Sequence, residues 1–183
     1  VLGTISERGG KQKFEYEKTE IKDGSLSAKF PCFEFAGSII PFNGNAKFGT
    51  GFQASLKIAV NMKGENKSDG SESKSFSFSA DAFGIFGNLE TYRYWAVDAN
   101  VDFTPGIVLS GVTLTGFSGG AYKHMMMTAN GGKPGTLGVS NSGNIYDPNP
   151  EVTLGLRAGV RMQFSGPKSL SGSAMLQFEF SGN

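Results

Sequence analysis

Apolar and polar residues alternate along several stretches of this chain, and the clearest alternation predicts a β-strand over 52–62. Its even positions are all apolar, and most of its odd positions are polar: Phe52, Ala54, Leu56, Ile58, Val60 and Met62 against Gln53, Ser55, Lys57 and Asn61. Successive side chains of a strand point to opposite faces, so a period of two predicts a sheet with one apolar and one polar face. The alternation resumes over 76–82 after the polar loop 64–73, which predicts a hairpin.

The C-terminal part repeats this pattern. Apolar residues occupy the even positions of 154–164 and most even positions of 172–180, and the turn-forming residues of 165–169 lie between the two runs. We therefore predict a second hairpin there.

The middle and the N-terminal third contain weaker signals. A run over 92–103 carries Trp95 on its odd, more apolar side, and Pro105-Gly106 is expected to end it in a turn. Two more strands are expected at 107–117 and 121–128, joined at Ser118-Gly119-Gly120, followed by a long ordered loop over 129–150. Near the N-terminus, strands are expected at 13–21 and 25–35 around a turn at 22–24, and 38–47 stays unassigned.

Composition agrees with an all-β class. The 183 residues include 16 Phe and 27 Gly, charged residues are few at 18%, and no amphipathic helix is recognisable. We expect a single all-β domain over 1–183 with about nine or ten long strands, arranged as an antiparallel sandwich or as a curved or barrel-like sheet. The absence of an initial Met and of a signal peptide predicts a processed protein or a fragment of a larger one.

Charge and cysteine content exclude some functions. The net charge of +1, with dispersed basic residues, argues against nucleic acid as a partner. The one cysteine, Cys32, precludes an internal disulfide, and its aromatic neighbours predict a buried apolar role. No stretch approaches the 18 apolar residues of a membrane-spanning helix.

No catalytic or metal-binding constellation is recognisable. His124 is the only histidine, which excludes multi-histidine metal sites, and no nucleophile elbow accompanies it. The three methionines that follow it must alternate between the two faces of a strand, so core packing explains at least one side. Asp98 and Asp102 share a strand face about 13 Å apart, which favours solvated or paired carboxylates over a glycosidase pair. We predict no enzyme activity, no cofactor and no metal site.

Aromatic residues are the remaining candidates for binding. Tyr92, Tyr94 and Tyr122 could form a stacking platform for a sugar on a sheet face, and Trp95 is a further candidate binding residue. The alternative is that these side chains cover a sheet edge or a second layer.

The alternation also raises the question of a membrane. Runs of nine to eleven alternating residues are typical of outer-membrane barrels as well as of soluble sheets. Three observations favour the soluble alternative: no Tyr or Trp girdle flanks the apolar runs, the serines of 75–79 suit a wet sheet face, and Arg93-Tyr94-Trp95 combines bulk with charge. A membrane is therefore a possible partner that the sequence does not favour.

Two segments resemble a known group of proteins. Phe86-Gly87-Asn88, followed by the segments 92–99 and 116–122, is similar to a recurrent stretch in very large, β-rich exported proteins of Bacteroidota. The segments 154–160 and 177–180 resemble a hairpin that follows it there. This resemblance covers about half of the chain and implies a context, namely a large parent chain, export and modular β architecture. It implies no catalytic residue.

Three functional hypotheses follow. The first is a non-enzymatic structural or binding module of a larger exported or cell-surface protein, which would present a sheet face and the 129–150 loop to other domains of the parent chain or to a protein or glycan partner. The second is a membrane-associated or lipid-handling β-barrel or groove. The third is a secreted effector or packaged cargo with an unrecognised activity.

Overall fold

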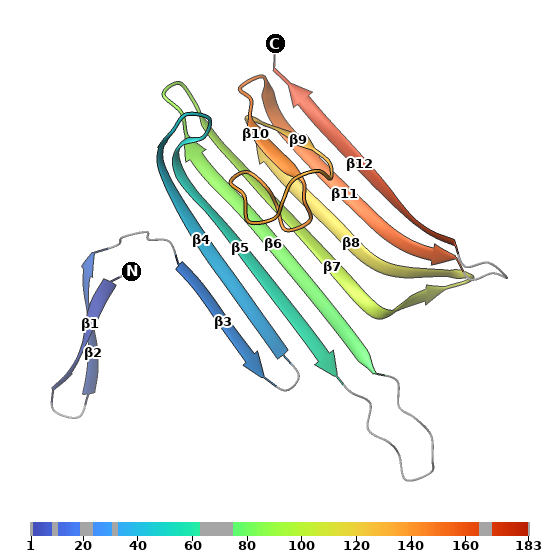
Figure 1. Cartoon of the computed structure of the whole chain (residues 1–183), viewed down its shortest axis with the longest axis horizontal. Coiled ribbons are helices and arrows are strands. Elements are labelled where there is room, and N and C mark those ends of the chain that lie inside the picture. The colour runs from blue at the N-terminus through green and yellow to red at the C-terminus, as the bar shows by residue number, and fades with distance from the viewer. Residues whose placement is uncertain are drawn as a thin grey trace, which may run out of the picture.

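The structure is a computed structural model. It describes residues 2–8, 11–18, 24–30, 33–62, 75–164 and 170–182. Their strands are shown in Figure 1 and have the following bounds: β1 Leu2–Arg8, β2 Lys11–Lys18, β3 Gly24–Phe30, β4 Phe33–Asn45, β5 Gly49–Met62, β6 Phe76–Asn88, β7 Arg93–Leu109, β8 Val112–Lys123, β9 Met125–Thr128, β10 Ile145–Pro148, β11 Val152–Phe164 and β12 Leu170–Ser181.

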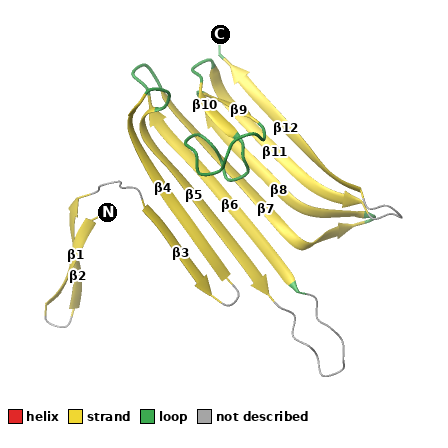
Figure 2. Ribbon diagram, in the orientation of Figure 1, coloured by secondary structure: helices red, strands yellow, loops and turns green. Residues whose placement is uncertain are grey.

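Eight of these strands form one large antiparallel sheet in the order β12-β11-β8-β7-β6-β5-β4-β3. The sheet is open, because β12 and β3 each have one neighbour among the described strands. Two small sheets, β1-β2 and β9-β10, complete the described secondary structure, which is entirely β (Figure 2). The all-β prediction is confirmed, and its strands are organised around a single sheet. Within the described residues no helix has the length and apolarity needed to cross a membrane.

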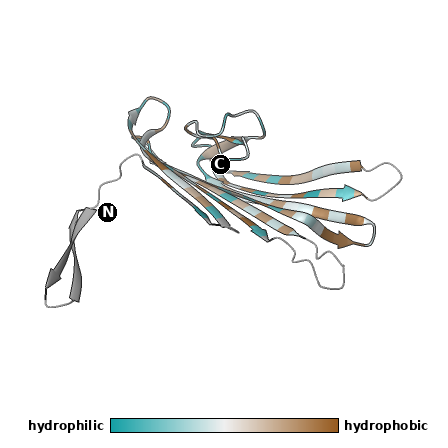
Figure 3. Ribbon diagram, turned by 60° about the horizontal axis from the view of Figure 1, so that its bottom comes forward, coloured by the Kyte–Doolittle hydropathy of each residue, from teal (hydrophilic) through white to brown (hydrophobic). Residues whose placement is uncertain are grey.

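The register of the strands turns the alternation of the sequence into two chemically different faces. Leu56 pairs with Ala82, which pairs with Ala99, and this row continues through Gly119 and Ala158 to Leu176. We call the side of the sheet that carries this row the apolar face. The adjacent row contains Lys57, Asp81 and Asn100, and its side is called the polar face. Figure 3 shows the resulting bands of hydrophobic and hydrophilic residues along the strands.

Both predicted hairpins are confirmed. Strands β5 and β6 pair from Thr50–Asn88 to Met62–Phe76, and β11 and β12 pair from Val152–Ser181 to Phe164–Leu170. Some predictions concern residues that lie wholly or largely outside the described ones, namely the loops at 64–73 and 165–169, the turn at 22–24, and Cys32. The ordered loop predicted after β9 is also confirmed, except that it contains the short strand β10.

The prediction for the N-terminal third was wrong in its pairing. The strand β2 pairs with β1 rather than with the segment that follows it. The predicted strand over 25–35 is two strands, β3 and β4, because the chain turns back between Phe30 and Phe33, which pair with each other. The segment 38–47, left unassigned, largely belongs to β4, where Pro41 pairs with Phe52.

The turns predicted in the middle of the chain were also wrong. Strand β7 continues past Pro105-Gly106, because a bulge between Asp102 and Ile107 absorbs the interruption. The turn lies instead at Ser110-Gly111, where both residues have a positive φ. The Ser118-Gly119-Gly120 segment, expected to be a turn, is in the middle of β8.

A second layer covers part of the polar face. After β8 the chain turns at His124, whose φ is 51°, and β9, the loop and β10 fold back over the sheet. In Figure 1 this segment lies across the middle strands. The buried core is formed where the layer meets the sheet, and its members are Phe48, Phe83, Ile85, Tyr94, Ala96, Tyr122, Met125, Met127, Tyr146 and Val152. Met125 and Met127 are buried and Met126 is exposed, as the alternation predicted.

Candidate functional site

Two rows of charged residues cross three neighbouring strands of the polar face. In the first row, Asp98 of β7, Gly120 of β8 and Arg157 of β11 are register partners. The second row repeats this arrangement four residues further along each strand, with Asp102, Gly116 and Arg161. Each arginine reaches across β8 to form an ion pair with the aspartate of its row. The sequence left open whether these two carboxylates are solvated or paired. In the structure, both are paired.

The glycines of β8 make these ion pairs possible. A Cβ atom at Gly116 would lie 2.7 Å from both Arg161 Nη2 and Asp102 Oδ1, and one at Gly120 would lie 2.9 Å from the Val97 carbonyl oxygen. A side chain at either position would obstruct the path between the outer strands. The glycines that suggested a turn therefore provide room for charges that meet across a strand.

The Asp98–Arg157 pair is the more enclosed of the two. The side chains of Asp98 and Arg157 are 0% and 4% exposed, whereas those of Asp102 and Arg161 are 51% and 37% exposed. Asn144 of the covering loop donates a hydrogen bond from Nδ2 to Asp98 Oδ2 at 2.8 Å. A buried carboxylate needs such partners, because an unpaired buried charge is strongly unfavourable.

Further hydrogen bonds attach the loop to the sheet. Gln53 of β5 accepts a hydrogen bond from the Gly138 amide at 2.8 Å and donates one to the Thr136 carbonyl oxygen at 3.3 Å. Asn141 donates to the Ala82 carbonyl oxygen at 3.3 Å. The loop is therefore held by side chains of β5 and β7 and by a backbone carbonyl of β6.

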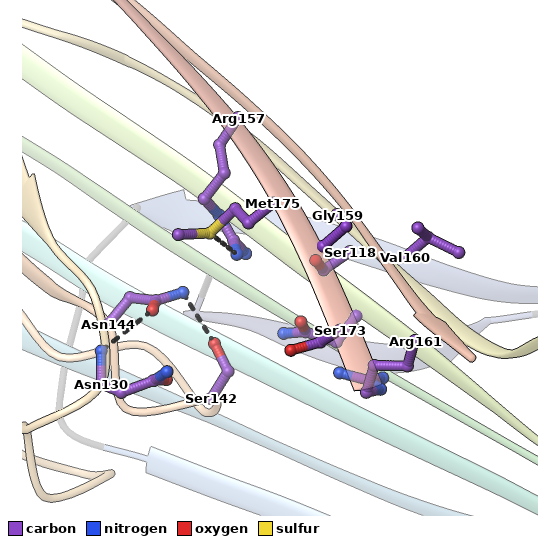
Figure 4. A pocket seen from close by; sticks show the side chains of 12 residues that line it. Ser118, Asn130, Ser142, Asn144, Arg157, Gly159, Val160, Arg161, Ser173 and Met175 are labelled. Carbon is purple, nitrogen blue, oxygen red and sulfur yellow. Dashed lines mark hydrogen bonds between the residues drawn. The ribbon is translucent and has the colours of Figure 1, made fainter. Parts of the chain in front are cut away.

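A polar cavity of about 260 Å³ lies beside the buried ion pair (Figure 4). Asn100 and Ser118 line it from the sheet, Ser142 and Asn144 from the loop, and Met175 from β12. Arg157 points into this region, where Nη1 approaches the Met175 sulfur at 3.6 Å and Nε has no hydrogen-bond partner within the described part of the chain. Its charged lining residues are Arg157 and Arg161, each paired with an aspartate of β7, and amides and hydroxyls provide the remaining polar surface.

Tyr94 and Tyr122 were candidates for an exposed stacking platform, but both are buried, at 1% and 0% exposure. The Tyr94 hydroxyl donates to the Phe48 carbonyl oxygen at 2.6 Å, and the Tyr122 hydroxyl donates to Glu179 Oε1 at 2.7 Å. Both rings lie over a glycine partner on the next strand, Gly87 and Gly155 respectively. Tyr94 and Tyr122 therefore belong to the core between the sheet and the covering layer.

The other two aromatic candidates lie elsewhere. Tyr92 is half-buried and contacts the His124 ring edge-on, with 5.7 Å between the ring centroids. His124 holds the turn after β8, because its Nδ1 atom lies 2.8 Å from the Arg93 carbonyl oxygen and its amide donates to the Val152 carbonyl oxygen. Trp95 is on the apolar face, opposite Tyr94. The four predicted binding residues therefore do not form one surface.

A residue that the sequence prediction missed is Tyr146, which joins the loop to the core. Its ring stacks on Phe83 and meets Tyr122 edge-on, with centroids 5.6 Å apart in both contacts. Burial and the nearby Asp98 carboxylate raise the pKa of Tyr146 well above its ordinary value. Burial likewise raises the pKa of Tyr94 and that of Tyr122, so all three hydroxyls are neutral in the folded protein.

The apolar face is the second candidate surface, and it is much larger. No charged residue occupies the apolar-face positions of β5 over 52–60, β6 over 76–86, β7 over 95–103, β11 or β12. Many large side chains on this face are exposed, including Phe86, Val97, Phe117, Leu156, Leu176 and Phe178. Among the described residues nothing covers this face, because the second layer lies on the other side of the sheet.

Aromatic side chains form two bands on the apolar face, with small and aliphatic residues between them. Phe52, Phe86 and Trp95 are register neighbours near one end, and the Phe52 and Phe86 rings stack at 5.3 Å. Near the other end, Phe103 contacts both Phe78 and Phe117, with centroids 5.9 Å apart. The residues between the bands include Ala54, Leu56, Ile58, Ala80, Ala82, Val97, Ala99 and Val101.

Among the residues that the structure describes, charged side chains appear on this side only at its end. Arg93 precedes the Trp95 band on β7 and Lys123 pairs with Trp95 from β8, and both side chains are exposed. Within the described residues no group of three or more His, Cys, Asp or Glu side chains could hold a metal ion. Comparison of the chain with protein-family models, curated proteins and solved structures gave no match.

Proposed function

We propose that this chain is a non-enzymatic structural module of a larger exported or cell-surface protein, and that its apolar sheet face lies against lipid acyl chains. The observation that carries this proposal is a broad, uncharged apolar face on a sheet whose own second layer covers the opposite side. Exposed apolar patches of soluble monomers rarely exceed a few hundred Å². A face that extends across most of an eight-stranded sheet is typical of a surface that does not meet water.

The length of the apolar face suits a bilayer. Along β6, the apolar positions extend from Phe76 to Phe86, which corresponds to about 33 Å at the usual rise per residue. The hydrocarbon core of a bilayer is about 30 Å thick, so a strand with a modest tilt could place this whole segment in lipid. A protein partner would impose no such match in length.

The distribution of residues along the face gives separate support. Tryptophan and tyrosine gather at membrane–water interfaces, and basic side chains extend from the margin towards water, whereas phenylalanine is equally suited to the hydrocarbon. Trp95 belongs to one aromatic band, and Arg93 lies just beyond it. Tyr94, whose bulk counted against a membrane in the sequence, points to the polar face instead.

The polar face supports the non-enzymatic part of the proposal. Asp98 and Asp102 are each engaged by an arginine, and His124 holds a turn. Asp98 and His124 hold the layer that covers the sheet, and the Asp102–Arg161 pair joins β7 to β11. We infer a structural module, located at the cell surface or outside the cell.

The only tryptophan of the chain gives a direct test, since Trp95 is on the apolar face. The protein is reconstituted into phosphatidylcholine vesicles whose acyl chains carry bromine, a fluorescence quencher, at a shallow or a deep position. We expect the vesicles to carry the protein upward in a flotation gradient and the shallow bromines to quench Trp95 most. A Trp95→Phe/Ala99→Trp variant moves the probe between the bands and should reverse the preference.

Two results would contradict the proposal. One is a protein that stays in the aqueous fraction on flotation. The other is tryptophan emission that no brominated lipid quenches although the protein floats with the vesicles, because the face would then be covered by something other than lipid.

A further inference from the structure

The free edge of β12 is the longest unpaired strand edge of the large sheet. β12 has twelve residues, contains no proline, and pairs only with β11 among the described strands. All of its residues are exposed. An edge of this kind offers a row of backbone N–H and C=O groups to another strand, and natural proteins normally protect it.

The charge on β12 gives little protection. Its single charged residue, Glu179, accepts hydrogen bonds from the Tyr122 hydroxyl at 2.7 Å and from Gln177 Nε2 at 3.1 Å, which hold it against the sheet. The opposite edge differs, since β3 has seven residues and carries Lys29, which forms an ion pair with Glu34 of β4. A short edge with a lysine is a usual means of preventing edge pairing. Of the two edges of the large sheet, as far as its strands are described, β12 is the longer and the less protected.

From this edge we propose that two copies of the chain pair antiparallel through β12, with Leu176 on the two-fold axis, so that the two large sheets become one. The proposal concerns the partner of an edge and does not depend on what covers the apolar face. An antiparallel pair of identical strands is closed by two-fold symmetry, which is the commonest symmetry of homo-oligomers.

The sequence of β12 complements itself in this register on the apolar face. Gly172 would oppose Phe180 of the second copy, and Ala174 would oppose Phe178. Large side chains thus meet small ones, and a Cβ atom at Gly172 has no neighbour within 4 Å in the single chain. The aromatic rings at 178 and 180 are more than half exposed in the single chain and would gain contacts from this pairing.

The same register also avoids a clash on the polar face. Glu179 would oppose Ser173 of the second copy rather than another Glu179, and Met175 would oppose Gln177. Like charges directly opposite each other destabilise strand pairing, whereas polar and apolar neutral pairs do not. The one charged residue of the edge is therefore compatible with this pairing.

Cysteine cross-linking tests the pairing and its register. In a Cys32→Ser background, Leu176→Cys should give a disulfide-linked dimer on mild oxidation, because opposed Cα atoms of antiparallel strands are about 4.5–5.5 Å apart. Gly172→Cys and Phe180→Cys should each stay monomeric alone, since the two like positions would be about 27 Å apart. A mixture of these two variants should cross-link.

A pair of charge variants provides an independent measurement of the same contact. Ser173→Lys places a positive charge opposite Glu179 of the second copy at two symmetric positions, and Ser173→Glu places a negative charge there. Sedimentation in a mild detergent should give a dimer dissociation constant that differs on the order of tenfold between the two variants, with the lysine variant tighter.

The outcomes separate this proposal from the lipid-facing one. Failure of Leu176→Cys to cross-link in a folded protein, or equal cross-linking of Gly172→Cys alone, would overturn it, even if brominated lipid quenches Trp95. Equal dissociation constants for the two Ser173 variants would also overturn it. Register-specific cross-linking would uphold it, even if the protein failed to float with vesicles.

Discussion

The two faces of the large sheet differ in what they bury. The polar face carries a second layer, and beneath that layer lie an aspartate, an arginine and three tyrosines with most of their polar atoms paired. The apolar face carries phenylalanines and aliphatic residues that no described residue covers. In this chain the polar side of the alternation is the inside of the molecule. Apolar alternation identifies a face, and it does not identify which face the chain itself covers.

The two faces also differ in the kind of interaction that stabilises them. Beneath the loop, specificity comes from hydrogen bonds and ion pairs with defined partners, such as Asp98 with Arg157 and Asn144. On the apolar face, any stabilisation must come from surface that leaves water only when another phase or molecule covers it. Substitutions on the two faces should therefore have different consequences.

The largest expected loss of stability comes from removing one partner of the buried Asp98–Arg157 ion pair. Arg157→Met leaves the Asp98 carboxylate buried without its cation, and such a change costs about 3–5 kcal/mol of unfolding free energy. Denaturant titration of the protein in a mild detergent measures this loss. The matched control is Asp98→Leu/Arg157→Met, which removes both charges and should recover most of the stability. A double variant as unstable as the single one would show that the pair is not the cause.

The second largest expected effect is a loss of stability at alkaline pH, caused by the tyrosines buried beneath the second layer. The pKa values of Tyr94, Tyr122 and Tyr146 are raised in the folded protein, so above about pH 10 the unfolded chain releases these protons and the folded one retains them. The unfolding free energy should therefore fall as the pH rises above 10 and be unaffected by these groups below it.

Denaturation at a series of pH values measures that slope, and tyrosinate absorbance shows when the hydroxyls ionise. A Tyr94→Phe/Tyr146→Phe variant should have a shallower alkaline slope than the wild type. Tyrosines that all titrate at their ordinary pKa in the folded protein would contradict the burial on which this prediction depends.

A smaller effect distinguishes two buried hydroxyls. Tyr94→Phe removes the hydrogen bond to the Phe48 carbonyl oxygen and should cost about 1 kcal/mol of unfolding free energy. The Tyr146 hydroxyl has no partner at hydrogen-bond geometry within the described residues, so Tyr146→Phe should be nearly neutral. Urea titration of the two variants side by side checks this order. A larger loss for Tyr146→Phe would mean that its hydroxyl is engaged in the folded protein.

Much of the large sheet could be predicted from the sequence, because a period of two is a local signal. The hairpin β11-β12 was predicted with nearly its observed extent, and in β5-β6 the predicted second strand, 76–82, is the first half of β6. The turn at Ser110-Gly111 was missed, since Pro105-Gly106 and the glycines of β8 are stronger local turn signals. Those glycines serve contacts between β7 and β11, which are distant in sequence, so no local pattern reveals their purpose.

The candidate site was harder to predict for the same reason. A spacing of four residues occurs three times, in Asp98 and Asp102, in Gly116 and Gly120, and in Arg157 and Arg161. This repeated spacing is the one signal that could have suggested the two rows. This spacing indicates ion pairs only if β8 lies between β7 and β11. That strand order depends on the turn at Ser110-Gly111, which the sequence prediction missed. The aromatic candidates were selected by residue type, and type does not tell which side the loop covers.

The most direct test of the central claim compares two adjacent positions on β5, where Leu56 belongs to the apolar face and Lys57 to the polar face. In a Trp95→Phe background, Leu56→Trp and Lys57→Trp place the single fluorophore on opposite sides of one strand. We predict that acyl-chain bromines in reconstituted vesicles quench the tryptophan at 56 strongly and the one at 57 little. Equal quenching at the two positions, or stronger quenching at 57, would contradict the claim that the apolar face alone meets lipid.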